Sequence, residues 1–203
     1  MEYFDIKKLI SENGWGGVSV ISQLQYLKEH EIKLYELTSR DDIVKATKNS
    51  VSCAKEEVII LGGDRDDARD PEVSEIYARK VPELGKENMK FMMNIEGWNL
   101  ENAKTILNSG VSVRHVSSDV RAGVIDDNMF AFYRTSIDPD YTKYVGTTQR
   151  QDEKMKTVGY ITDHKPFVKK MKAYLQEKWE IATPAEEVIS KIETLREPTQ
   201  ESL

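Results

Sequence analysis

The chain has 203 residues, which suits one domain with an appendage and lets roughly 70% of the extended surface be buried without disulfides or a structural metal. Its 39% hydrophobic and 32% charged residues exclude a disordered or fibrous protein. A formal net charge of -6 argues against direct nucleic-acid binding by this chain, which would need clustered cations, but does not exclude a small anionic or polar effector.

Several features predict a cytoplasmic protein without membrane association. No apolar run approaches the roughly 20 residues that span a bilayer, and the segment 1–15 lacks the long apolar core of a secretory signal. The single cysteine, Cys53, cannot form an internal disulfide or a thiolate metal cluster, as is usual in a reducing compartment. No cofactor or metal is expected.

The N-terminal part divides into an appendage and the start of a domain. Residues 1–30 are expected to be the appendage, with a helix over 18–30. The domain is expected over 31–182, beginning with a strand over 32–37 in which apolar and polar residues alternate. A helix capped by Thr38 or Ser39 should then run to about residue 55.

Strands and helices alternate from there to residue 116. The apolar run 58–61 predicts a buried strand, a helix should begin at Pro71 behind an Asp cap, and a strand is expected over 89–95. A helix over 100–108 and a strand over 111–116 follow. This alternation is typical of parallel βαβ units, so the fold class is α/β with a mixed, mostly parallel sheet flanked by helices.

The pattern changes at residue 121, where a hairpin is expected. Strands over 121–125 and 129–134 are joined only by Asp126-Asp127-Asn128 and must pair antiparallel. One or two more strands are expected within 142–148 and 157–162. A helix with its apolar face at 167–179 then closes the domain, and 183–203 should form a C-terminal helix and tail that either packs on the same chain or pairs with its twin.

The segment 114–132, RHVSSDVRAGVIDDNMFAF, gives the most specific information about function. A charged strand, a short polar link, this hairpin and the later helix resemble the phospholipase D-like superfamily over roughly residues 32–182. More narrowly, the chain is similar to the regulatory or sensor branch found in archaeal transcriptional regulators and sensor proteins. The resemblance implies a homodimer, because members of the family join two such halves.

The family's enzymes use a His-x-Lys-x-x-x-x-Asp motif in which the histidine attacks phosphorus and the lysine binds phosphate. On this chain the motif falls on Asp119, Arg121 and Asp126, so the spacing is kept but an acid replaces the histidine. No His-x-Lys pair occurs anywhere in the sequence. A carboxylate would repel an incoming phosphodiester and cannot form the phosphohistidine, which predicts that the chain is not an enzyme.

Two interpretations of the charged residues at and around the motif remain open. Residues Arg114, His115, Asp119, Arg121 and Asp126 could hold an anionic or polar effector, since the planar guanidinium suits phosphate and carboxylate. They could equally form an internal salt-bridge network that replaces the lost chemistry. A single histidine such as His115 on a strand is more often structural than a ligand.

A second candidate site follows the strand 58–61, because ligands of open α/β sheets lie beyond the carboxyl ends of the strands. Asp64 and Arg65 lie there behind the Gly62-Gly63 pair, although the acidic loop could simply be solvated, and its sequence does not match a calcium loop. Trp98 is expected at the same rim, where it could cover a ligand or seal the core.

These observations predict an effector-binding regulatory domain acting in signal transduction or transcription as a homodimer. Its effector would bind in a cleft between the loops after Leu37, Leu61 and Ile95, with Arg114 and Arg121 contributing charge. One alternative is a phosphodiesterase or nuclease with a rearranged site that uses His115 or His164. Another is an adaptor without ligand that presents a surface to a regulatory protein partner.

Overall fold

A computed structural model describes residues 35–37, 40–62, 71–118, 121–137 and 155–196 of the chain. Its strands are β1 (Tyr35–Leu37), β2 (Val58–Leu61), β3 (Met89–Met93), β4 (Ser112–His115), β5 (Arg121–Ile125), β6 (Met129–Ile137), β7 (Met155–Thr162) and β8 (Thr183–Pro184). Its α-helices are α3 (Arg40–Cys53), α4 (Pro71–Leu84), α5 (Leu100–Asn108), α6 (Lys165–Ile181) and α7 (Ala185–Arg196), and short 3-10 turns occur at η1 (Lys86–Asn88) and η2 (Gly97–Asn99). The expected helix over 18–30 and the candidate strand 142–148 lie outside the described residues.

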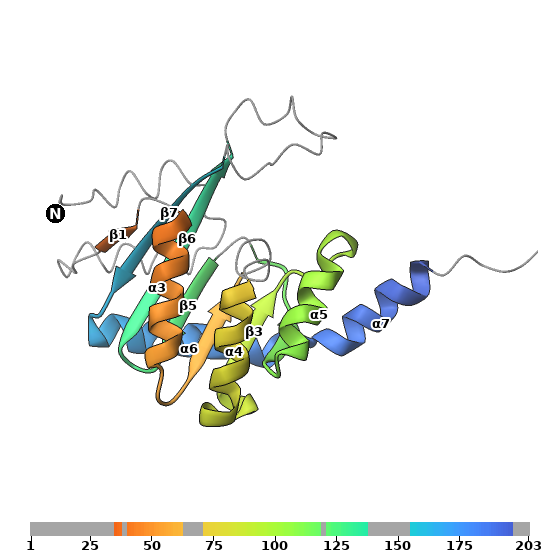
Figure 1. Ribbon diagram of the computed structural model, residues 1–203, viewed down its shortest axis with the longest axis horizontal. Coiled ribbons are helices and arrows are strands. Elements are labelled where there is room, and N and C mark those ends of the chain that lie inside the picture. The colour runs from red at the N-terminus through yellow and green to blue at the C-terminus, as the bar shows by residue number, and fades with distance from the viewer. Residues whose placement is uncertain (1–34, 38–39, 63–70, 119–120, 138–154, 197–203) are drawn as a thin grey trace, which may run out of the picture.

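The strands form one mixed sheet in the order β1-β7-β6-β5-β2-β3-β4-β8 (Figure 1). Strands β2, β3 and β4 are parallel neighbours connected through α4 and α5, as the alternation of strands and helices predicted. The hairpin β5–β6 is also confirmed, with Ile125 paired to Met129 across its turn. The α/β class and the mixed sheet are therefore confirmed.

The balance of strand directions differs from the expectation of a mostly parallel sheet. Among the described strands, β2–β3 and β3–β4 pair parallel, whereas the other five pairings are antiparallel. The physical reason is that β1 is not a neighbour of β2. Strands β5, β6 and β7 lie between them, and β1 pairs antiparallel with β7 at the edge of the sheet.

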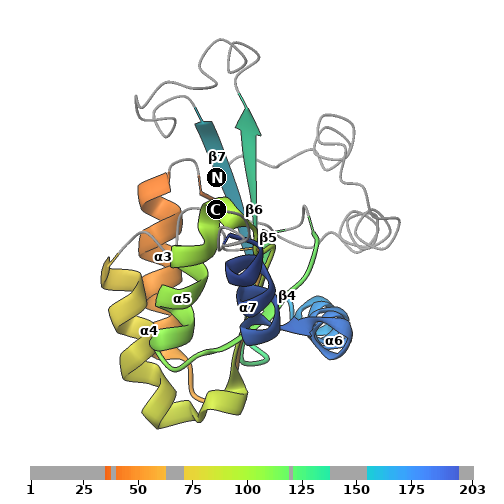
Figure 2. The same ribbon diagram turned by 90° about the vertical axis from the view of Figure 1, so that its right-hand side faces the viewer.

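Helices cover both faces of the sheet, with α3, α4 and α5 on one side and α6 on the other (Figure 2). On the side of α3, α4 and α5, the core contains buried side chains from alternate positions of the strands, among them Ile60, Phe91 and Val113. On the opposite side, α6 buries apolar residues that recur at helical spacing along one face of the helix. They are Phe167, Val168, Met171, Leu175 and Trp179.

Helix α7 contributes to the same core as α3, α4 and α5. Ala185 and Ile189 are buried in the same cluster as Val113, and the ion pair between Lys104 of α5 and Glu193 of α7 measures 2.8 Å. Of the two expectations for this helix, packing on its own chain is the one the structure shows. No helix within the described residues combines the length and apolar character needed to cross a bilayer.

Candidate functional site

Arg121 begins β5 at the edge of the sheet where the parallel strands end. Ala122 pairs with Leu61, the last residue of β2, and the chain then turns at Gly62 with a φ of 88°. Asn94 and Val116 follow the ends of β3 and β4 at this same edge. We call it the carboxyl edge; it is the location expected for a ligand of such a sheet.

His115 also reaches the carboxyl edge, but its ring has a structural role. Its Nδ1 accepts a hydrogen bond of 3.0 Å from the backbone N–H of Ile95. A neutral imidazole in this position carries its proton on Nε2. His115 therefore presents a donor, and neither ring nitrogen is available as a nucleophile or a base. Strand order places β4 three strands from β5, about 14 Å at the usual spacing.

Arg114 points to the opposite face of the sheet from His115, as neighbouring residues of a strand do. Its Nη1 donates to the carbonyl oxygen of Trp179 at 2.7 Å, and its guanidinium lies 4.5 Å from the centre of the Trp179 ring. Arg114 thus caps the carboxyl end of α6, where a cation also complements the helix dipole. It does not join Arg121 in one site.

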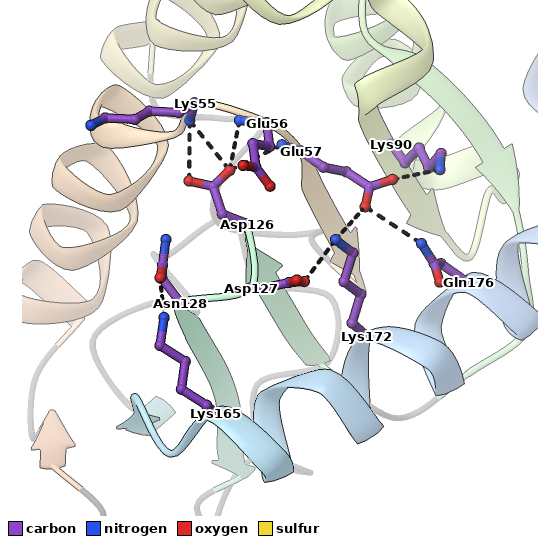
Figure 3. Close-up of polar contacts among 10 residues, drawn as sticks. All are labelled: Lys55, Glu56, Glu57, Lys90, Asp126, Asp127, Asn128, Lys165, Lys172 and Gln176. Atoms are coloured by element: carbon purple, nitrogen blue, oxygen red, sulfur yellow. Dashed lines mark hydrogen bonds and ion pairs between the residues drawn. The ribbon is translucent and has the colours of Figure 1, made fainter.

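Asp126 lies at the other end of β5 from Arg121, at the amino end of β2, which we call the amino edge. The two are five positions apart along β5, about 16 Å at the rise of a β-strand. Asp126 is 5% exposed and has a positive φ of 53°. Its carboxylate accepts from the backbone N–H groups of Lys55 (3.1 Å), Glu56 (2.9 Å) and Glu57 (3.0 Å) (Figure 3).

This carboxylate anchors the hairpin to the chain that enters β2. The backbone N–H of Asp126 also donates to the carbonyl oxygen of Glu57 at 2.8 Å. Burial raises the pKa of Asp126, but the three backbone donors outweigh it, so that the pKa is lowered overall. Asp126 therefore has a structural role at the amino edge, at the other end of β5 from Arg121.

The amino edge also holds an ionic network that sequence analysis missed. Glu57, with its side chain 11% exposed, pairs with Lys90 of β3 at 2.6 Å and with Lys172 of α6 at 3.2 Å. Lys172 also pairs with Asp127 of the hairpin turn at 2.9 Å, and Gln176 donates to Glu57 at 3.5 Å (Figure 3). The network joins β3, α6 and the hairpin, which are far apart in sequence, so only the tertiary fold could reveal it.

The charges in this network stabilise one another. Burial lowers the pKa of Lys172, but hydrogen bonds to Asp127 and Glu57 outweigh burial and raise the pKa overall. Lys165 of α6 also donates to the side chain of Asn128 in the hairpin turn. This network is a different one from the salt-bridge network expected among Arg114, His115, Asp119, Arg121 and Asp126, because its ion pairs join Glu57, Lys90, Lys172 and Asp127.

Trp98 lies at the carboxyl edge on η2, directly after β3, as expected. Its side chain is 51% exposed, and its Nε1 donates to Glu96 at 2.6 Å. The second Glu96 oxygen accepts from Asn94 at 2.7 Å. Asn99, 1% exposed, fastens the turn by accepting from the backbone N–H of Glu96 and donating to the carbonyl oxygen of Asn94.

Of the remaining predicted residues, the structure describes only His164. Asp64, Arg65 and Asp119 lie outside the described residues. His164 caps the start of α6, where its Nδ1 accepts from Phe167 at 3.4 Å, and the next residue contacts the hairpin turn at the amino edge. Within the described ranges, no three His, Cys, Asp or Glu side chains are grouped as metal ligands would be.

The loops after Leu37 and Leu61, expected to form a cleft with the loop after Ile95, fall mostly outside the described residues, whereas the strands that lead into them are described. Leu37 pairs with Gly159, which pairs with Tyr133, which pairs with Arg121. The end of β1 is thus level with Arg121 but separated from it by β6 and β7, and from the ends of β2 and β3 by more strands still. The carboxyl edge that remains is defined by Arg121, Gly62, His115 and Trp98.

No protein-family model matches the sequence, and no curated protein shows significant sequence similarity to it. The fold, however, matches Nuc, a phospholipase D family member from Salmonella typhimurium, with a TM-score of 0.51 and 12% identity over 75% of this chain and 97% of Nuc. The chain has the phospholipase D-like fold.

Two further structures with this phospholipase D-like fold extend the comparison. The phosphatidylserine synthase of Haemophilus influenzae Rd KW20 matches with a TM-score of 0.50 and 14% identity over 80% of this chain and 42% of that one. TrmBL2, an archaeal chromatin protein, gives 0.49 and 16% over 88% of this chain and 62% of its own. The chain therefore spans less than two thirds of these two proteins.

The comparison corrects one prediction. The absence of a His-x-Lys pair led to the expectation that the chain is not an enzyme. The structures that share this fold include Nuc, a phospholipase D family member, and a phosphatidylserine synthase, which contradicts the exclusion of enzymatic activity on sequence grounds. The missing motif excludes a phosphohistidine at residue 119, because an aspartate stands there, but does not exclude other routes.

Proposed function

We propose that the chain is a phosphodiesterase of the phospholipase D-like superfamily with a rearranged site at the carboxyl edge. The observation that carries the proposal is the place of Arg121. It begins β5 at the carboxyl ends of β2 and β3, and the resemblance to the phospholipase D-like superfamily assigns to it the position of the family's phosphate-binding lysine. Its guanidinium can hold two phosphate oxygens at once.

The described histidines do not supply the nucleophile of this proposed reaction. His115 accepts the Ile95 N–H and His164 lies at the amino edge. We therefore assign the chemistry to direct hydrolysis. Water attacks phosphorus and gives a proton to the base, the bond from phosphorus to one alcohol oxygen breaks, and the departing alkoxide takes a proton from solvent water. Asp119, two residues before Arg121, is the candidate base, and the positive charge of Arg121 offsets the repulsion between this carboxylate and the phosphodiester.

Hydrolysis of bis(p-nitrophenyl) phosphate tests the proposal. We expect turnover by the unmodified chain and its loss, by at least about a hundredfold, in Asp119→Asn and in Arg121→Ala. His164→Gln, which changes a histidine at the amino edge, is the matched control and should keep the rate. His115→Gln should keep it as well, because a glutamine oxygen can accept the Ile95 N–H. Absence of turnover by the unmodified chain would overturn the proposal.

A second candidate is effector binding by a cytoplasmic regulatory domain that works as a homodimer and passes its signal to a partner protein. It is supported by the carboxyl edge itself, where the planar guanidinium of Arg121 suits a phosphate or carboxylate, whereas His115 and Asp126 have structural roles. A thermal-shift screen of phosphorylated metabolites tests it, since a ligand of the native state must raise the melting temperature. A shift that disappears in Arg121→Ala, without turnover of any phosphodiester, would favour this candidate over the first.

A further inference from the structure

The last two residues of β4, Arg114 and His115, contact three different parts of the chain. The ring of His115 accepts a hydrogen bond of 3.0 Å from the backbone N–H of Ile95, in the turn over residues 94–99. The guanidinium of Arg114 donates to the carbonyl oxygen of Trp179 at 2.7 Å and lies 4.5 Å from the centre of the Trp179 ring. The backbones of both residues pair with β8. The end of β4 therefore joins this turn to the end of α6 and to β8.

The turn is an ordered unit that His115 fastens to the sheet. Asn99, 1% exposed, accepts from the backbone N–H of Glu96 at 2.8 Å and donates to the carbonyl oxygen of Asn94 at 2.7 Å. The side chain of Ile95 is buried in the main apolar cluster. If the ring of His115 moved away, the N–H of Ile95 would lose its partner, which is unfavourable for a group close to the core. The positions of the turn and of the His115 ring are therefore interdependent.

Helix α7 is attached beside β4 by few buried side chains. Among its described residues, Ala185 and Ile189 are buried, in the same cluster as Val113 of β4 (Figure 2). The ion pair of Glu193 with Lys104 joins side chains that are 49% and 33% exposed, and exposed pairs contribute little to stability. The strand that leads into α7, β8, pairs with only two residues of β4. An element with so few buried contacts opens locally more easily than the rest of the core.

We propose that the end of β4 couples the turn 94–99 to the docking of α7, so that loosening the turn releases α7 and ordering the turn holds it. When the turn moves, His115 loses its donor, the end of β4 is less firmly fixed, and β8 loses part of its support. The two states of this element are α7 docked and α7 undocked. A ligand that contacts the turn then shifts α7 by as much as it favours one arrangement of the turn. The inference does not depend on hydrolysis at Arg121.

Hydrogen exchange of the backbone amides of α7, measured on the full chain, tests the coupling. His115→Ala removes the acceptor of the Ile95 N–H and should raise the exchange rates in α7 about tenfold, the factor that corresponds to loss of one such hydrogen bond. His115→Gln, which keeps an acceptor oxygen, should restore most of the protection. Asn99→Asp keeps the acceptor of the Glu96 N–H but loses the donor to Asn94, so it should raise the rates by a smaller factor.

The matched control is Asp126→Ala, which removes hydrogen bonds to residues 55–57 at the amino edge and should leave the exchange rates in α7 unchanged. An equal rise in His115→Ala and Asp126→Ala would show that α7 opens only with the whole molecule and would overturn the coupling. Unchanged rates in a folded His115→Ala chain would overturn it as well. If His115→Ala does not fold, Asn99→Asp is compared with Asp126→Ala and the same two outcomes decide. Turnover of a phosphodiester enters none of these measurements, so the proposed function is tested separately.

Discussion

Asp126 shows how one residue can keep its place in a motif and serve another purpose. Its carboxylate binds three consecutive backbone N–H groups between α3 and β2, and its backbone adopts a φ of 53°, which Asp and Asn tolerate better than most residues. This side chain therefore joins the hairpin turn to the entry of β2, in addition to the contacts of Asp127 with Lys172 and of Asn128 with Lys165.

Replacement of Asp126 should measure this dependence. Asp126→Ala leaves three backbone donors without their acceptor and should lower the free energy of unfolding by about 1.5–3 kcal/mol. Asp126→Asn keeps one acceptor oxygen and tolerates the positive φ, so its loss should be smaller. Urea denaturation provides the measurement. Asp127→Ala, which removes a 60% exposed partner of Lys172, is the control and should cost less than about 1 kcal/mol.

The pH dependence of stability should report the same carboxylate. Because the folded pKa of Asp126 is lowered, its contribution is complete above the unfolded value of about 3.9 and is lost as pH falls through the lower folded value. Denaturation curves taken between about pH 6 and pH 3 should therefore show a steeper acid loss for the unmodified chain than for Asp126→Asn. Parallel curves would mean that the carboxylate does not titrate with folding.

Sequence analysis grouped Arg121 and Asp126 in one motif, but it did not place them at opposite ends of β5. Arg121 and Asp126 have the spacing of the lysine and the aspartate in the family's motif. Because a strand begins at Arg121 and ends just before Asp126, the two residues must lie at opposite ends of that strand. That signal was available from the predicted hairpin. The three N–H groups that bind Asp126 were not predictable, because they come from residues 55–57, about 70 positions earlier in the chain.

At the level of elements, the end of α6 depends on a residue of β4. Arg114 donates to the Trp179 carbonyl and stacks on the Trp179 ring, close to the point where α6 gives way to β8 and α7. The helix itself was predictable from its apolar period, and so was the start of α7 from Thr183-Pro184. The short strand β8 was not, because two residues carry no periodicity and pair only through contact with β4.

Arg114→Ala should therefore destabilise the C-terminal elements. Loss of the hydrogen bond and of the cation–π contact should reduce the free energy of unfolding by about 1–3 kcal/mol and alter the near-ultraviolet circular dichroism of Trp179. Arg114→Lys should recover only part of the loss, because an ammonium cannot donate and stack at once as the planar guanidinium does. Full recovery by lysine would show that charge alone is needed.

At the scale of the whole molecule, the parallel half of the sheet followed from sequence, whereas only the hairpin β5–β6 of the antiparallel half did. Local alternation of strands and helices fixes β2, β3 and β4 as neighbours, because right-handed βαβ crossovers leave little choice. The position of β1 depends on pairing with a distant strand, and its own three residues do not indicate which one. For the same reason, the end of β1 lies several strands away from the ends of β2 and β3, with which it was expected to form a cleft.

The resemblance to the family also predicts assembly into a homodimer. A chain with one phospholipase D-like half is expected to pair with a second copy, so light scattering during size-exclusion chromatography should give twice the mass of one chain. The mass should not change on addition of a reducing agent, because the prediction involves no disulfide through Cys53. A mass of one chain at the highest concentration reached would contradict it.

The pairing of β1 with β7 has a consequence for synthesis. Tyr35 lies opposite Ile161, so a strand that leaves the ribosome early must wait for one made near the end of translation. During that interval β1 has an unpaired backbone on both sides, while the parallel strands β2 to β4 can already assemble with their helices. We expect β1 of the nascent chain to remain accessible to chaperones and proteases until β7 has been synthesised.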